Sequence, residues 1–233
     1  INFAKENMKN ISFKIHLIDH NSDLKDLEII KKKLVQSGIL YNFINLNISE
    51  FKNKINPINQ NNESVSKNMF STMSSIYKSI LIAKESCDDL IYFVEDDYLH
   101  QKEAISEMIF TYERISSQFK KDLIMCPSDY PFLYNKVDKT HIFLGSKRHW
   151  RTTQETLLTF MISKKLIKKH WVSLEKMCQL EHSPFEKPLH EIYEHELCLS
   201  PIPSLAMHCT NINSVYGLPP NFDWKKNWEE NID

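Results

Sequence analysis

Glycine is scarce in this chain of 233 residues. Its three glycines, Gly38, Gly145 and Gly217, are isolated, and none lies in a glycine-rich segment. A loop that receives a nucleoside triphosphate is normally rich in glycine, because its backbone must approach the phosphates closely. The lack of such a loop argues against a nucleotidyltransferase, an enzyme that binds a nucleoside triphosphate.

Long apolar segments and paired cysteines are also missing. No apolar run approaches the roughly 18 residues that a membrane-spanning helix needs, and the first residues lack the charged and apolar regions of a signal peptide. The five cysteines are odd in number, widely spaced and free of CxxC pairs, which argues against a disulfide framework and a zinc knuckle. We therefore expect a cytoplasmic protein without a membrane span, either free or peripheral at the membrane.

The charges of the chain nearly cancel, with 29 Lys and Arg residues against 30 Asp and Glu residues and a net charge of −1. This balance gives no general electrostatic reason to bind nucleic acid. The length suits one substantial core, so we expect a single domain over residues 1–233, with residues 209–233 as a C-terminal loop or tail. Nothing in the sequence indicates an oligomeric state.

The first half of the chain predicts a strand, a helix and a second strand. Residues 11–19 alternate as a strand does, and the polar residues that follow supply a turn and a helix N-cap. The helix continues to Ser37 and ends at Gly38, and residues 39–46 form the next strand. Such a unit implies parallel pairing, and ligands of parallel sheets bind beyond the carboxyl ends of the strands.

The remaining elements follow from apolar periodicity and from turn residues. We predict helices over residues 69–85, 101–118, 163–179 and 188–199, strands over residues 90–94, 123–126, 141–145, 156–162 and 201–208, and a loop over residues 149–153.

Three consecutive acids, Glu95, Asp96 and Asp97, follow the apolar strand of residues 90–94. Neighbouring carboxylates repel one another unless a positive group neutralises them, and a divalent cation is a common solution. On an extended segment Glu95 and Asp97 point the same way, so both can bind one ion while Asp96 faces elsewhere. The alternative is that these acids only cap the next helix.

In their order, these parts resemble the GT-A glycosyltransferases, and most closely the family 2-like group. The resemblance spans residues 11–208 and rests on three segments: HLIDHNSD at residues 16–23, YFVEDDY at residues 92–98, and FEKPLHEIYEHELCLSPIPSLAMHC at residues 185–209. It implies an α/β fold of GT-A type, a Rossmann-like, mostly parallel mixed sheet flanked by helices.

The resemblance also implies a site for a nucleotide-diphosphate sugar. The segment YFVEDDY resembles the family's DXD motif, which binds the metal that bridges the diphosphate. The metal ligands expected here are Glu95, Asp97 and His208, a mixed set that suits Mn²⁺ better than Mg²⁺. The residues expected to bind the donor are Asp19, Asn21, Ser22 and Asp96, together with Trp150 as a stacking platform and Arg151 as a phosphate ligand. Arg151 could equally pair with a structural carboxylate.

A transfer with inversion of configuration also needs a base for the acceptor hydroxyl. In the family this base lies on the helix that residues 188–199 resemble. We expect Glu194 to be the base, with Glu191 as the second candidate. The predicted function is therefore a metal-dependent, inverting glycosyltransferase of hexosyltransferase type that uses a glycan or a lipid-linked acceptor. The alternatives are a sugar nucleotidyltransferase and a catalytically silent domain that binds a glycan or a partner protein.

Two features depart from the family pattern. The strand that normally precedes a helix like residues 1–10 is absent, which indicates a fragment or a diverged start. Glu95 also replaces the first Asp of the strictest DXD motif, which keeps the carboxylate chemistry but changes the length of one ligand.

Overall fold

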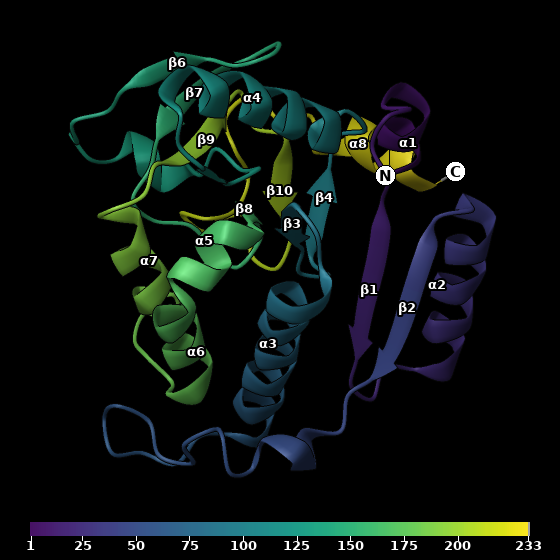
Figure 1. Ribbon diagram of the computed structural model, residues 1–233, viewed down its shortest axis with the longest axis vertical. Coiled ribbons are helices and arrows are strands. Elements are labelled where there is room, and N and C mark those ends of the chain that lie inside the picture. The colour runs from purple at the N-terminus through teal and green to yellow at the C-terminus, as the bar shows by residue number, and fades with distance from the viewer. Residues whose placement is uncertain (233) are drawn as a thin grey trace.

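The structure, a computed structural model, describes residues 1–232 and shows a mixed α/β fold (Figure 1). Its strands are β1 (Lys14–Asp19), β2 (Leu40–Asn45), β3 (Leu90–Phe93), β4 (Tyr98–His100), β5 (Ile124–Met125), β6 (Ile142–Leu144), β7 (His149–Thr152), β8 (Phe160–Ser163), β9 (Cys198–Ile202) and β10 (Ala206–His208). Its α-helices are α1 (Asn2–Asn7), α2 (Leu24–Ser37), α3 (Lys67–Ser86), α4 (Ala104–Phe119), α5 (Lys164–Lys169), α6 (Trp171–Gln179), α7 (Lys187–Tyr193) and α8 (Trp224–Ile232), and its 3₁₀ helices are η1 (Ile48–Phe51) and η2 (Pro131–Tyr134).

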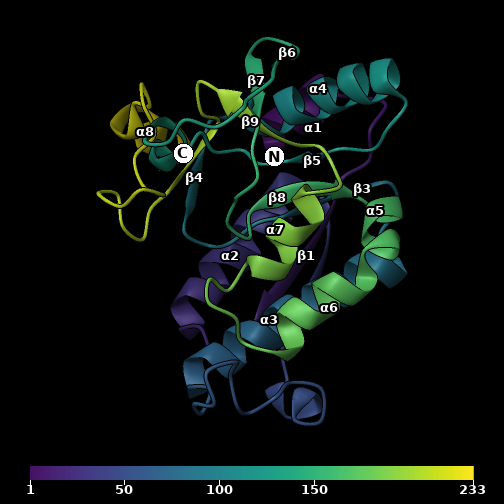
Figure 2. The ribbon, with the colours of Figure 1, turned by 90° about the vertical axis from the view of Figure 1, so that its left-hand side faces the viewer.

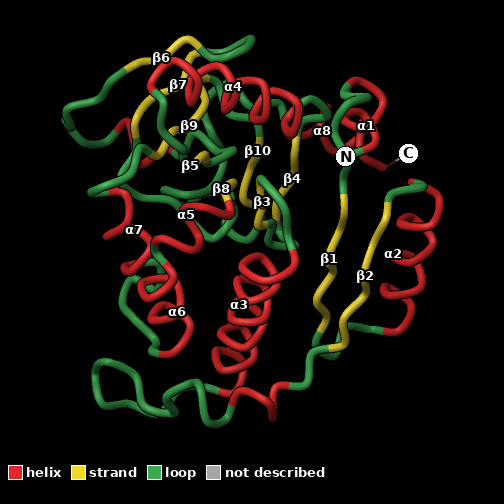
Figure 3. Tube along the Cα trace, viewed as in Figure 1, coloured by secondary structure: helices red, strands yellow, loops and turns green. Residues whose placement is uncertain are grey.

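The predicted strand, helix and strand at the start of the chain are confirmed. Helix α2 begins where the Asp23 carboxylate accepts a hydrogen bond of 2.8 Å from the backbone N–H of Lys25, and it ends at Gly38, whose φ of 58° is left-handed. Strands β1 and β2 are parallel, as the crossover requires. They pair with each other in a sheet of their own, and Figure 3 shows this pair beside α3.

The main sheet of residues 1–232 has six strands in the order β3-β8-β5-β9-β7-β6. Neighbouring strands run antiparallel except for β5 and β9, which are parallel. The expectation of a mostly parallel sheet is therefore wrong. Strand direction depends on long-range topology, and β8 enters between β3 and β5 without a crossover of the β1–α2–β2 kind.

The six-stranded sheet is covered on both faces. Strand β8 shows this division, because Phe160 and Ile162 belong to a core cluster with α3, α5, α6 and α7, whereas Met161 belongs to a second cluster with α1 and α4. Successive residues of a strand point to opposite faces. Figure 2 shows the two groups of helices on either side of the strands.

The prediction of a loop over residues 149–153 is wrong. Residues His149–Thr152 form β7, which pairs with β6 on one side and with β9 on the other. Polar residues with one large aromatic look like a loop in isolation, but Trp150 is fully buried and Arg151 is 8% exposed. Tertiary burial overrides the local pattern here.

The second half of the chain also differs in its boundaries. The helix predicted over residues 188–199 is the shorter α7, and its last part belongs to β9, while the strand predicted over residues 201–208 is divided between β9 and β10. The helix predicted over residues 163–179 breaks at His170 into α5 and α6. Strand β4 and helix α8 were not predicted, and α8 lies within the expected C-terminal tail.

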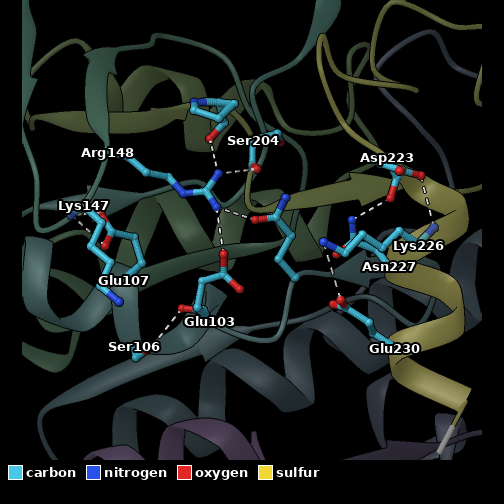
Figure 4. Close-up of polar contacts among 12 residues, drawn as sticks. Glu103, Ser106, Glu107, Lys147, Arg148, Ser204, Asp223, Lys226, Asn227 and Glu230 are labelled. Carbon is cyan, nitrogen blue, oxygen red and sulfur yellow. Dashed lines mark hydrogen bonds and ion pairs between the residues drawn. The ribbon is translucent and has the colours of Figure 1, made fainter.

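Arg148 ties the turn between β6 and β7 to two distant segments. Its guanidinium group donates to Glu103 Oε1 at 3.0 Å and to the carbonyl oxygen of Ser204 at 2.9 Å. Figure 4 shows these contacts. The same group donates to the carbonyl oxygen of Pro203 at 2.9 Å and to the side chain of Gln101. These bonds fix the start of α4 against the segment that leads from β9 into β10.

Candidate functional site

The three consecutive acids connect β3 to β4. Val94 and Glu95 follow the end of β3, and Asp96 and Asp97 form a turn directly before β4. Glu95 is held by Thr159, whose hydroxyl oxygen accepts from the Glu95 backbone N–H at 3.0 Å and whose hydroxyl group donates to Glu95 Oε2 at 3.3 Å. Asp96 is exposed, whereas Glu95 and Asp97 are half-buried. Asp96 thus differs from its two neighbours in exposure, and the segment that separates them is a turn and not the extended strand that the sequence predicted.

Asp97 meets His208 because β4 and β10 are antiparallel neighbours, with His208 opposite Tyr98. The Nε2 atom of His208 lies 2.8 Å from Oδ2 of Asp97, and the Thr210 hydroxyl donates to the same oxygen. The backbone N–H of Cys209 donates to the carbonyl oxygen of Asp97 at 2.7 Å. Two residues 111 positions apart, expected to share a metal ion, are thus in direct contact.

Two atoms of this pair are buried without a hydrogen-bond partner: Oδ1 of Asp97 and Nδ1 of His208. A buried polar atom without a partner costs stability, so such atoms usually bind a ligand, an ion or a water molecule. Residues 1–232 contain no ready-made group of three His, Cys, Asp or Glu side chains that could hold a metal ion. The arrangement instead fits an ion that takes one or two protein ligands and completes its shell with phosphate oxygens and water.

The electrostatics of Glu95 differ from those of an ordinary surface acid. Burial raises the pKa of Glu95 to about 7, and the negative charges of Asp97 and Glu186 add to the effect, while the hydrogen bond from Thr159 opposes it. Glu95 is therefore only partly ionised at neutral pH. A cation placed beside Asp97 would reverse this effect and favour the carboxylate form.

Glu186 is the site residue that the sequence reasoning missed. It lies at the N-cap of α7, and burial raises the pKa of its carboxyl group, while the nearby His190 and His208 oppose that rise. Its negative charge raises the pKa of Glu95, so the carboxyl group of Glu186 lies near the acid group. The available signal was an acid just before Pro188, a residue that commonly starts a helix.

The structure places Glu191 and Glu194 at exposed positions further along α7. Glu194 is the C-cap of the helix, and the charge of Glu191 acts on His182. The acid of this helix that the structure brings to Glu95 is therefore Glu186, at the other end of α7 from Glu194.

The expected roles of Trp150 and Arg151 need correction. Trp150 is fully buried in the core, and its Nε1 atom donates to Glu107 Oε1 at 3.3 Å, so its ring offers no face to a sugar. Arg151 forms a buried ion pair with Asp129, and its guanidinium carbon lies 4.3 Å from the ring centre of Tyr134. Arg151 thus takes the structural alternative, a pairing with a carboxylate.

The turn predicted to bind the donor follows β1. Asp19 ends that strand, Asn21 adopts a left-handed φ of 64°, and Asn21 and Ser22 are exposed. His20 fixes the turn to α3, because its Nδ1 atom lies 2.6 Å from the hydroxyl oxygen of Ser71. Helix α3 leads into β3, so one helix supports both this turn and the strand that carries Glu95.

No known protein family matches the sequence, and no curated protein matches it either. None of the helices in residues 1–232 is long and apolar enough to cross a bilayer.

Proposed function

We propose that the protein is a metal-dependent glycosyltransferase of GT-A type, which moves a sugar from a nucleotide-diphosphate sugar to a hydroxyl acceptor. The observation that carries this proposal is the contact between Asp97 and His208, beside Glu95, with one oxygen of Asp97 buried and unpaired.

Of the predicted ligands, Asp97 and His208 are in contact and would hold Mn²⁺ or Mg²⁺ together with the diphosphate of the donor, while Glu95 is the third candidate because its charge is coupled to that of Asp97. When bound, the ion neutralises the negative charge that develops on the departing diphosphate. Asp19, Asn21, Ser22 and Asp96 are the candidates for contacts to the nucleotide, because the first three form the turn after β1 and Asp96 is exposed beside Asp97. Trp150 and Arg151 do not belong to this set because they are buried.

In the proposed reaction the acceptor hydroxyl oxygen attacks the anomeric carbon of the donor sugar. The bond from that carbon to the phosphate oxygen breaks, and the nucleoside diphosphate leaves with the electron pair. The hydroxyl proton passes to a carboxylate within hydrogen-bond reach. Glu186 is favoured for this role because its charge acts on Glu95, and Glu194 and Glu191 are the further candidates that the sequence predicted.

The first test is thermal unfolding with UDP, GDP or CDP, each with and without Mn²⁺. A ligand that binds only the folded state at about a hundred times its dissociation constant adds roughly 2.7 kcal/mol, which shifts the midpoint by a few degrees. We expect one nucleotide to stabilise the protein only with metal, and Asp97→Asn to abolish the shift.

The matched control is Glu113→Gln on the exposed face of α4, which should keep the full shift. A nucleotide shift that needs no metal, or one that survives in Asp97→Asn, would contradict the proposal. If no nucleotide stabilises the folded protein, the interpretation as a silent binding domain takes its place.

A further inference from the structure

An aromatic cluster lies next to the candidate site, at the loop that follows β10. Tyr216 in that loop packs on Tyr130 and Phe132, with ring centres 5.5 and 5.1 Å away. The backbone N–H of Phe132 donates to the carbonyl oxygen of Val215 at 3.0 Å and so holds the loop against η2. Tyr130 and Phe132 are buried, whereas Tyr216 is half-buried and is the ring of the three that reaches the surface.

The cluster connects directly to the acids of the site. The hydroxyl oxygens of Tyr130 and Tyr98 lie 2.6 Å apart, and the ring of Tyr98 lies 5.2 Å from that of His208. The Nζ atom of Lys136 lies 5.3 Å from the ring centre of Phe132 and 2.9 Å from Glu155, which places Glu155 beside the cluster. Burial raises the pKa of the Tyr216 hydroxyl, and the charges of Glu155 and Glu186 raise it further. The charge of Glu186 also raises the pKa of Glu95, so Tyr216 and Glu95 have this acid as a common neighbour.

The charges around Tyr216 disfavour an anionic ligand. Two cations lie in this region. The Nζ atom of Lys136 lies 2.9 Å from Glu155 and 3.2 Å from Asp138. The guanidinium group of Arg151 is paired with Asp129. Each of these cations is thus neutralised by a carboxylate. A phosphate or carboxylate placed here would meet Glu155 and Glu186 without a free partner of opposite charge.

We propose that Tyr216, on its base of Tyr130 and Phe132, forms the acceptor subsite and takes an uncharged sugar residue of a glycan. An aromatic face packs against the apolar C–H face of a sugar ring, while the carboxylates of Glu155 and Glu186 accept hydrogen bonds from its hydroxyl groups. The subsite excludes acceptors whose reacting sugar carries a phosphate or a carboxylate, including a first sugar attached to a lipid diphosphate. This inference rests on the proposed function and narrows its acceptor class.

The test measures saturation transfer by NMR from the protein to methyl glucoside, methyl galactoside and methyl N-acetylglucosaminide, with glucose 1-phosphate and glucuronate as charged probes. We expect transfer to at least one neutral glycoside and none to the charged probes. Tyr216→Ala should weaken the neutral binding about tenfold, the size of one aromatic stacking contact, while Tyr216→Phe keeps it. Trp228→Ala on the exposed face of α8 is the control and should bind as the natural protein does.

A second variant tests the charge argument without touching the aromatic ring. Glu155→Gln removes one of the two carboxylates that neutralise Lys136, so an anion meets less repulsion and glucose 1-phosphate should gain detectable binding. Equal binding of glucose 1-phosphate and methyl glucoside to the natural protein would overturn the inference, as would unchanged binding by a folded Tyr216→Ala. If that variant does not fold, Glu155→Gln decides: failure to admit glucose 1-phosphate overturns the inference.

The two proposals fail separately. If a nucleotide raises the midpoint of thermal unfolding only with Mn²⁺ and no neutral glycoside binds, the transferase proposal is retained and the acceptor subsite is rejected. Glycoside binding that depends on Tyr216, without any nucleotide shift, retains the sugar subsite and replaces the transferase by a glycan-binding domain.

Discussion

The hydroxyl groups of Tyr98 and Tyr130 lie 2.6 Å apart and form a hydrogen bond between β4 and the loop that follows β5. Tyr98 is adjacent to Asp97 in sequence, and Tyr130 lies beneath Tyr216. Burial raises the pKa of both tyrosines, so both stay neutral at physiological pH. This one bond joins the acidic half of the candidate site to its aromatic half.

Removing one of the two hydroxyl groups should cost more than removing both. Tyr98→Phe leaves the buried Tyr130 hydroxyl with only the weak hydrogen bond to the Cys126 thiol, and we expect the free energy of unfolding to fall by about 1–2 kcal/mol in urea. The double variant Tyr98→Phe/Tyr130→Phe should recover part of that loss, because neither hydroxyl is left unpaired. A double variant that loses as much stability as Tyr98→Phe alone, or more, would contradict this prediction.

Glu95 should destabilise the metal-free protein at alkaline pH. Its pKa in the folded state is about 7, above the ordinary value of 4.5, so its contribution to stability is lost as the pH rises through this range. Glu95→Gln should therefore raise the free energy of unfolding at pH 8 by about 1–3 kcal/mol, measured by urea unfolding in EDTA. The same variant should reduce the stabilisation by Mn²⁺ and nucleotide. A loss of stability at pH 8 would contradict this prediction.

His100 should make the fold sensitive to mild acid. Burial lowers the pKa of His100 from 6.5 to about 4, and its Nε2 atom lies 2.5 Å from the hydroxyl oxygen of Tyr92. Between these two pH values the unfolded chain binds a proton that the folded protein does not, so stability is lost as the pH falls from 6.5 to 4. The natural protein should lose about 1–3 kcal/mol more than His100→Gln over this interval, measured by urea unfolding. Parallel pH profiles of the two proteins would exclude a role for His100.

Arg148 should be important for stability although it lies outside the site. Its side chain is 13% exposed and donates to two carbonyl groups, to Gln101 and to Glu103. Arg148→Met leaves these acceptors without their donor, and we expect the free energy of unfolding to fall by about 2–4 kcal/mol in a urea titration. Arg114→Met, an exposed arginine of α4, is the control and should change it by less than about 0.5 kcal/mol. Equal effects of the two variants would argue against the network.

Features that depend on local sequence were predictable. The cap at Asp23, the left-handed Gly38 and the apolar periodicity of α2 act within a few residues, and they defined the first β1–α2–β2 unit correctly. The acids after β3 were likewise recognisable as a group that packing alone does not require. The approach of His208 to Asp97 was expected from the family resemblance alone, and the structure places the two in contact.

Features that depend on distant partners were not predictable. The direction of β8 and the strand character of residues His149–Thr152 follow from neighbours far away in the sequence. Trp150 looked like a binding platform because aromatic and basic residues have the same local appearance in a core strand and in a binding loop. Glu186 was passed over because position along α7 relative to Glu95, and not the spacing of acids on a helix, decides which carboxylate reaches the site.

The separation of β1 and β2 from the six-stranded sheet has a consequence for how the molecule opens. The backbone hydrogen bonds of this pair are made within the pair, while β8 and β5 are each bonded on both sides. The unit of β1, α2 and β2 can therefore detach without breaking a strand pairing of the larger sheet, so its amide hydrogens should exchange with solvent before those of β8. The turn from Asp19 to Ser22 belongs to this first unit to unfold, and a ligand bound there would delay the exchange of the whole unit.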